Sequence, residues 1–76
     1  MNIGDKIKNA REENKLTQTQ ASESLMVSRQ TISNWENGKT LPDIVSVITM
    51  SVLYQISLDD LLKGDHKMKE NVWFIQ

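Results

Sequence analysis

The 76-residue sequence contains no cysteine, one histidine, one proline and three glycines, and these shortages exclude several classes of protein. Without cysteine, the chain forms neither disulfides nor thiolate metal sites, and His66 alone cannot hold a zinc ion. The sequence shows no His/Cys/Asp cluster, no glycine-rich phosphate loop and no nucleophile–base pair, so neither an enzyme nor a cofactor is expected. A chain of this length forms one small domain, and such domains often gain stability by associating.

The chain also lacks the strong positive charge that is typical of nucleic-acid-binding proteins. Its net charge is −1, with six Lys/Arg against five Asp/Glu in residues 1–41 and three against five in residues 42–76. Phosphate neutralisation supplies much of the affinity for nucleic acid. Any DNA-binding role is therefore expected to need two copies of the chain.

Neither a signal peptide at the N-terminal segment nor a membrane span is expected from the sequence. The N-terminal segment is charged and lacks the apolar stretch of a signal peptide. The uncharged run at residues 44–58 is shorter than a membrane span and is interrupted by Ser, Thr and Gln. A cytoplasmic protein of bacterial or phage type, without a membrane partner, is expected.

Helical periodicity and capping residues predict an all-α, five-helix domain at residues 1–64, followed by a short C-terminal tail at 65–76. Strand patterns and internal repeats are absent from the sequence. The expected helices cover residues 3–14, 17–25, 28–37, 42–54 and 57–63.

Local signals mark the ends of these helices. Residues 17–20 (TQTQ) fit a capping box, Ser28 is a good N-cap, and Gly38 ends the third helix. Pro42 is expected in the first turn of the fourth helix. Met26 lies in the turn before the third helix, where a left-handed backbone would favour Gly or Asn.

On a helix that spans residues 28–37, one side carries an arc of Arg, Gln, Ser and Asn side chains without a carboxylate. Ile32 and Trp35 fall on the opposite side. Arginine pairs with guanine, glutamine or asparagine with adenine, and serine with either, so this arc suits the reading of base edges. A polar solvent-exposed surface is the alternative, and the arc alone does not separate the two. The arc consists of Arg29, Gln30, Ser33, Asn34 and Asn37.

The surrounding sequence, LTQTQASESLMVSRQTISNWENGKTLPDI, resembles the lambda-repressor-like, Cro-type (xenobiotic response element) family of helix-turn-helix transcriptional regulators. The strongest matches are Leu16–Gln18, Val27–Ser33, Trp35–Lys39 and Pro42–Asp43, and Ile56–Leu62 matches the closing helix of the family. The resemblance covers residues 3–64. It implies a lambda-repressor-like DNA-binding domain whose third helix enters the major groove of double-stranded operator DNA.

The resemblance also implies roles for individual side chains. Four residues of the third helix would contact bases: Arg29, Gln30, Ser33 and Asn34. Five residues around it would contact the DNA backbone, which sets register rather than sequence. These are Thr17, Gln18, Asn37, Lys39 and Thr40.

Arg11 and Glu36 are expected to have a structural role. Each lies at the border of the apolar side of its helix. The family pairs the two positions, so the resemblance implies an ion pair between the first and third helices. A DNA contact by Arg11 is the alternative.

The segment 44–58 contains no charged residue. Helical spacing predicts that one side of it packs in the core, through Ile44, Val47, Ile48, Ser51 and Tyr54. Val45 and Val52 form a second stripe, for which we expect a dimer interface rather than ordinary surface substitution. Trp73 and Phe74 in the tail are further candidates for a dimer interface. Docking of the tail on its own domain, or continuation into a segment absent from this chain, is equally compatible with the sequence.

The function expected from the sequence is therefore sequence-specific transcriptional regulation. The chain would act as a repressor that binds a palindromic operator as a homodimer. The acidic second half and the apolar tail leave one alternative, an antitoxin-like or adaptor module that binds a protein partner on the same fold.

Overall fold

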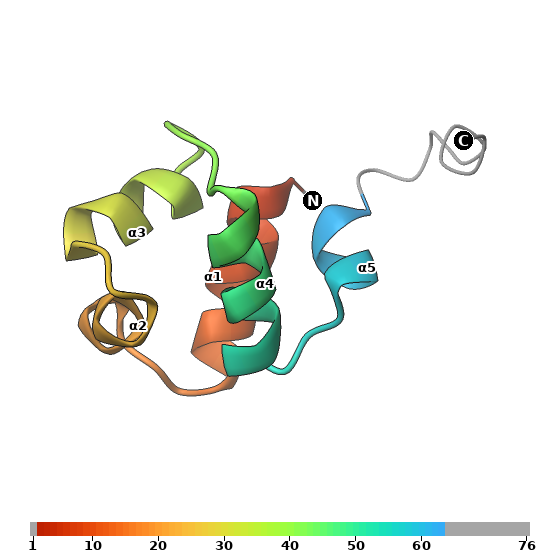
Figure 1. Cartoon of the computed structure of the whole chain (residues 1–76), viewed down its shortest axis with the longest axis horizontal. Coiled ribbons are helices and arrows are strands. Elements are labelled where there is room, and N and C mark those ends of the chain that lie inside the picture. Colours follow the sequence, from red (N-terminus) through yellow and green to blue (C-terminus); the bar gives the residue numbers. More distant parts are fainter. Residues whose placement is uncertain (1, 64–76) are drawn as a thin grey trace.

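The computed structural model describes residues 2–63, and within that range the chain forms α-helices joined by short loops (Figure 1). The helices are α1 (Ile3–Glu13), α2 (Gln18–Leu25), α3 (Arg29–Glu36), α4 (Ile44–Leu53) and α5 (Leu58–Leu62). The prediction of an all-α, five-helix fold is confirmed. The tail, with Trp73 and Phe74, lies outside the described residues.

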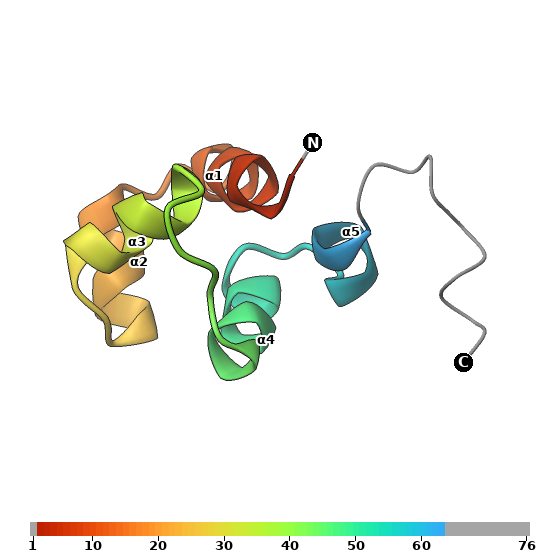
Figure 2. The same ribbon diagram turned by 90° about the horizontal axis from the view of Figure 1, so that it is seen from above.

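The helices are arranged along the long axis of the molecule. Figure 2 shows α2 and α3 together at one end and α5 toward the other. Between them, α1 and α4 lie on opposite sides. The α2–α3 unit is thus presented at one end of the domain.

Each described helix begins after a residue whose side-chain oxygen accepts a hydrogen bond from a first-turn backbone N–H. Thr17 and Gln20 form the expected capping box, with reciprocal bonds of 2.8 and 3.0 Å. The placement of Pro42 in the first turn of α4 was wrong. Asp43 is the N-cap because its carboxylate accepts the first-turn N–H, so the proline precedes the cap. The five caps are Asn2, Thr17, Ser28, Asp43 and Ser57.

Four of the helices are followed by a left-handed residue, and only Gly38 (φ 78°) is a glycine. The others are Lys15, Met26 and Gln55, at φ 58°, 60° and 55°. After each, the next N–H bonds a carbonyl five residues earlier, as in a Schellman motif. The expected left-handed Met26 is confirmed, and the sequence did not predict the same conformation at Lys15 and Gln55.

One hydrophobic core joins the helices, and α4 contributes to it differently from the prediction. Val47, Met50 and Tyr54 are buried, whereas Ile44 and Ile48 are 62% and 47% exposed. Placing the two isoleucines in the core was wrong, because α4 turns its Val47–Met50 side inward and fills the core with Met50. Within residues 2–63, no helix is long and apolar enough to cross a bilayer. The core residues are Ile7, Ala10, Ala21, Ile32, Trp35, Val47, Met50, Tyr54 and Leu61.

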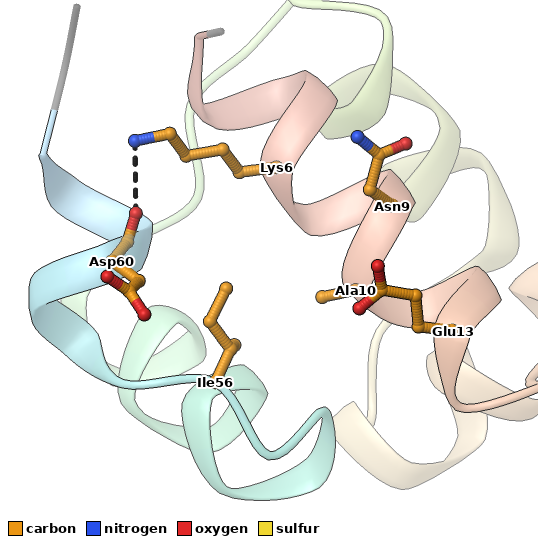
Figure 3. Close-up of a pocket in the computed structure, with 6 residues that line it drawn as sticks. All are labelled: Lys6, Asn9, Ala10, Glu13, Ile56 and Asp60. Atoms are coloured by element: carbon orange, nitrogen blue, oxygen red, sulfur yellow. Dashed lines mark hydrogen bonds between the residues drawn. The ribbon is translucent and has the colours of Figure 1, made fainter.

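A lysine of α1 holds the last helix in place. The Lys6 ammonium donates to the Asp60 carbonyl at 3.0 Å (Figure 3). It also donates to the carbonyl of Lys63, at the C-terminal end of α5. A cation at this end complements the helix dipole. Between α1 and α5 lies a shallow depression lined by Lys6, Asn9, Ala10, Glu13, Ile56 and Asp60.

Candidate nucleic-acid interface

The exposed side of α3 carries the residues that the sequence assigned to base contacts. Arg29 and Gln30 are exposed, while Ser33 and Asn34 are half-buried. On the opposite side, Ile32 and Trp35 are 1% and 5% exposed and anchor the helix in the core. The helix therefore presents a fixed polar surface to its surroundings.

The polar side chains of α3 are paired with one another along the helix. Gln30 Nε2 donates to Asn34 Oδ1 at 3.1 Å, and Asn37 Nδ2 donates to Ser33 Oγ at 3.2 Å. Both pairs are four residues apart, the spacing at which helical side chains meet. The first pair leaves Gln30 Oε1 and Asn34 Nδ2 for other partners. An adjacent acceptor and donor complement an adenine edge in the major groove.

Gln18 connects this surface to the interior. Its side-chain oxygen accepts from Arg29 Nη1 at 3.0 Å, and its Nε2 donates to Glu36 Oε1 at 3.0 Å. The first residue of α2 thereby bridges the first and last residues of α3. The family resemblance implied that Gln18 would brace the third helix, but residue spacing did not indicate either bond, since residues 11 and 18 positions apart carry no helical spacing signal.

Glu36 is also one half of a buried ion pair with Arg11. Arg11 Nε and Nη2 donate to the two carboxylate oxygens at 2.7 and 3.0 Å, and both residues are less than 10% exposed. Arg11 Nη1 donates to the Leu16 carbonyl at 2.8 Å. The hydrogen bond from Arg11 to Glu36 raises the pKa of the guanidinium, which stays charged. The pair joins α1 to α3 and neutralises the carboxylate of Glu36.

Tyr54 lies in the same buried region. Burial and the negative charge of Glu36 together raise the pKa of its phenol to about 12. The side chain is 2% exposed, so it stays neutral at physiological pH and adds no charge to the core. The charges of this buried region are therefore those of Arg11 and Glu36, which neutralise each other.

Gly4 allows α1 to approach the end of α3 closely. A Cβ at Gly4 would lie 2.8 Å from the carbonyl oxygens of both Trp35 and Glu36. These obstacles are backbone atoms, which cannot move aside as a flexible side chain would. This contact could not be predicted, because a glycine inside a helix does not reveal which neighbour approaches it.

The N-terminal ends of α2 and α3 carry no carboxylate. Their caps, Thr17 and Ser28, are uncharged, and neither first turn contains an acidic residue. By contrast, Asp5 lies in the first turn of α1, and Asp59 and Asp60 in that of α5. A helix N-terminus attracts anions, so the ends of α2 and α3 are the ones left open to phosphate.

The loop after α3 is held close to the helix. The backbone N–H groups of Lys39 and Thr40 donate to the Asn34 carbonyl at 2.9 and 3.4 Å. Gly38 adopts φ 78°, and a Cβ placed on it would meet no atom within 4 Å, so this turn borders open space. Lys39 and Thr40 are exposed. The structure thus brings the candidate backbone contacts of this loop next to the polar surface of α3. Gln18 contacts the same helix through its bonds to Arg29 and Glu36.

Known families and structures share this arrangement. A helix-turn-helix family model matches residues 7–61. The chain is 38% identical over 65 residues to the transcriptional activator BcrR of Enterococcus faecalis, covering 86% of this chain and 32% of BcrR. It is 35% identical over 71 residues to the transcriptional regulator ImmR of Bacillus subtilis, covering 93% and 56%. The chain thus spans between a third and just over half of these curated relatives.

Solved structures give the same result. The P22 c2 repressor in complex with a synthetic operator superposes with a TM-score of 0.78 and 34% identity, covering 86% of this chain and 98% of that one. A SinR–SinI protein complex contains a chain with a TM-score of 0.76 and 25% identity, covering 93% and 70%. From the matched residues and the shared arrangement of helices, the chain belongs to the XRE-type, lambda-repressor-like helix-turn-helix family of DNA-binding regulators.

Proposed function

We propose that this protein is a sequence-specific transcriptional regulator that reads double-stranded DNA with α3 in the major groove. One observation carries the proposal: the exposed surface of α3 contains no carboxylate and is fixed through Gln18 to a buried ion pair. A surface built to read bases needs donors and acceptors that are already in position. The residues that contact bases in this proposal are Arg29, Gln30, Ser33 and Asn34.

The DNA backbone is held on both sides of α3. The carboxylate-free N-terminus of α2 brings Thr17 and Gln18 to one phosphate strand. Gln18 uses one amide hydrogen on Glu36 and keeps the other for a phosphate. Asn37, Lys39 and Thr40 contact the backbone from the loop after α3.

Two copies bind one operator in this proposal. With a net charge of −1, a single copy gains little from phosphate neutralisation. A homodimer that binds half-sites about 34 Å apart, one turn of DNA, requires an approximate palindrome. The similarity to the P22 c2 repressor supports repression as the outcome. The matched relatives are named as transcriptional regulators and do not favour the antitoxin-like or adaptor alternative, although one matched chain comes from a complex of two proteins, SinR and SinI.

Selection from a random oligonucleotide pool followed by gel-shift titration tests the proposal. We expect enrichment of a palindrome. Gln30→Ala and Asn34→Ala should each relax the preference at particular base pairs, by about 1–3 kcal/mol. Lys39→Ala should weaken all sequences alike and reduce the salt dependence. No enrichment at low salt would contradict the proposal. A tight protein partner whose binding survives Arg29→Ala would favour the adaptor alternative.

A further inference from the structure

One side of α4 is apolar, and no other part of residues 2–63 covers it. We call this the α4 surface. Its five side chains are 77% (Leu41), 62% (Ile44), 66% (Val45), 47% (Ile48) and 75% (Val52) exposed. A soluble monomer seldom leaves so many large apolar side chains side by side in water. The α4 surface consists of Leu41, Ile44, Val45, Ile48 and Val52.

Helical geometry makes these residues one continuous patch. At 100° per residue, the four that lie in α4 itself fall within an arc of about 100°, away from the buried side that holds Val47, Met50 and Tyr54. No charged residue occurs between Ile44 and Leu58. A helix that is apolar on both sides is normally buried on both.

We propose that the α4 surface is the contact between two copies of this chain, packed around a two-fold axis. The proposal rests on the dimeric function proposed above and assigns its interface. In a symmetric contact each side chain near the axis faces its own counterpart, so any charge there meets a like charge. The α4 surface has none. Two such patches would bury on the order of 1,000 Å² in total, the lower end for a specific interface.

The position of α4 in the molecule is also compatible with a second copy of the chain as the partner. Figure 2 shows the α2–α3 unit at one end of the molecule and α4 on the side away from α1. A two-fold axis along the long axis, passing outside α4, places both α2–α3 units at the same end of the dimer. Both α3 helices then reach one DNA duplex from either side of the axis, as a palindrome requires.

A charge-swap experiment at Ile48, near the centre of the α4 surface, tests the contact in the full chain. Ile48→Glu and Ile48→Lys should each be monomeric by sedimentation equilibrium, with unchanged helical circular dichroism. The unsubstituted protein should reach twice the chain mass over the same concentration series. An equimolar mixture of the two variants should recover the dimer, because opposite charges then face each other. Leu62→Glu is the matched control, since Leu62 is 44% exposed on α5.

Four results would count against the assignment. One is a native mass in both Ile48 variants, and another is a monomeric native protein up to its solubility limit. The third is a dimer that Trp73→Ala or Phe74→Ala dissociates while the Ile48 variants leave it intact, which would assign the contact to the tail. Failure of the mixed variants to re-form a dimer would likewise count against a two-fold contact at this position.

DNA binding separates this assignment from the proposed function. Ile48→Glu should bind a single half-site as the native protein does, and should lose about 100-fold or more on the full palindrome, because linkage between the half-sites is gone. Equal binding of the palindrome by Ile48→Glu and the native protein would refute the α4 interface and leave DNA reading intact. A native dimer that selects no DNA sequence would refute the function and leave the interface.

Discussion

The consecutive helices α3 and α4 bury one side in the same core and expose surfaces of opposite chemistry. The exposed side of α3 carries Arg, Gln, Ser and Asn, whereas that of α4 carries Ile and Val. Hydrogen bonds of Gln18 hold the polar surface of α3 in position and connect it to the Arg11–Glu36 pair. The α4 surface has no comparable attachment. A surface that reads hydrogen-bonding groups must be oriented before binding, while an apolar surface needs only shape and area.

The largest expected effect comes from removing the support of α3. Arg11→Ala leaves the Glu36 carboxylate buried with Gln18 as its remaining side-chain donor, which should reduce the free energy of unfolding by about 3–5 kcal/mol. Urea denaturation followed by circular dichroism measures this loss. Glu12→Ala is the control, because Glu12 is exposed and only 3.9 Å from Arg11 Nη2.

A double substitution separates the charge from the fold. Arg11→Met combined with Glu36→Leu removes both charges and should recover much of the lost stability, since no buried charge stays unpaired. If Arg11→Ala instead melts at the native temperature but no longer binds DNA, Arg11 is a DNA contact and the buried pair is not what supports α3.

Gly4→Ala tests the close approach of α1 to α3. The new Cβ meets two backbone carbonyl oxygens, so α1 must shift, and we expect a loss of about 1–3 kcal/mol in unfolding free energy. Alanine's better helix propensity offsets at most about 1 kcal/mol of it. Thermal denaturation measures the difference. Because α4 takes no part in this contact, dimer formation through the α4 surface should be unchanged. A more stable Gly4→Ala variant would show that α1 has room to spare.

The sequence predicted features that depend on neighbours along the chain. The capping box at Thr17, the cap at Ser28 and the left-handed Met26 follow from local rules, and the structure contains all three. Among features that depend on distant neighbours, the Arg11–Glu36 pair was expected only through the family resemblance, and others were missed. The bonds of Gln18 to Arg29 and Glu36 and the packing of Gly4 require the tertiary fold.

The misplacement of Ile44 and Ile48 has a different cause. Every position of α4 from Ile44 to Leu53 is apolar or a small hydroxyl residue, so periodicity cannot tell the inner side from the outer one. In α3, polar and apolar residues alternate with the helical period, and Ile32 and Trp35 were placed correctly in the core. The second apolar side that hid the orientation of α4 is the same feature that indicates a partner.

Gln18→Ala tests whether the polar surface of α3 must be held in position, because it removes the hydrogen bonds of Gln18 to Arg29 and Glu36 without unfolding the domain. Glu36 keeps both Arg11 bonds, so the expected loss in unfolding free energy is only about 1–2 kcal/mol. Arg29 loses its partner and the duplex loses the phosphate contact proposed for Gln18, so base discrimination at the position of Arg29 and the overall affinity should both fall. Gel-shift titration on matched and mismatched operators measures both. Gln20→Ala, which removes a capping bond on the same helix, should leave discrimination unchanged. Equal effects of the two variants would mean that Gln18 acts only on stability.

Met26 is an apolar residue among the polar exposed side chains of α2 and α3. Its substitution has the smallest expected effect. It is the single large exposed apolar side chain between Thr17 and Asn37, a stretch that the structure describes throughout, and its backbone is left-handed at φ 60°. Met26→Gly removes that strain and should raise the free energy of unfolding by about 0.5–1 kcal/mol. Met26→Ala, which keeps the strain and removes the thioether, is the control in urea denaturation. A gain in both variants would trace the cost of Met26 to its exposed side chain, whereas a gain confined to glycine assigns it to the turn.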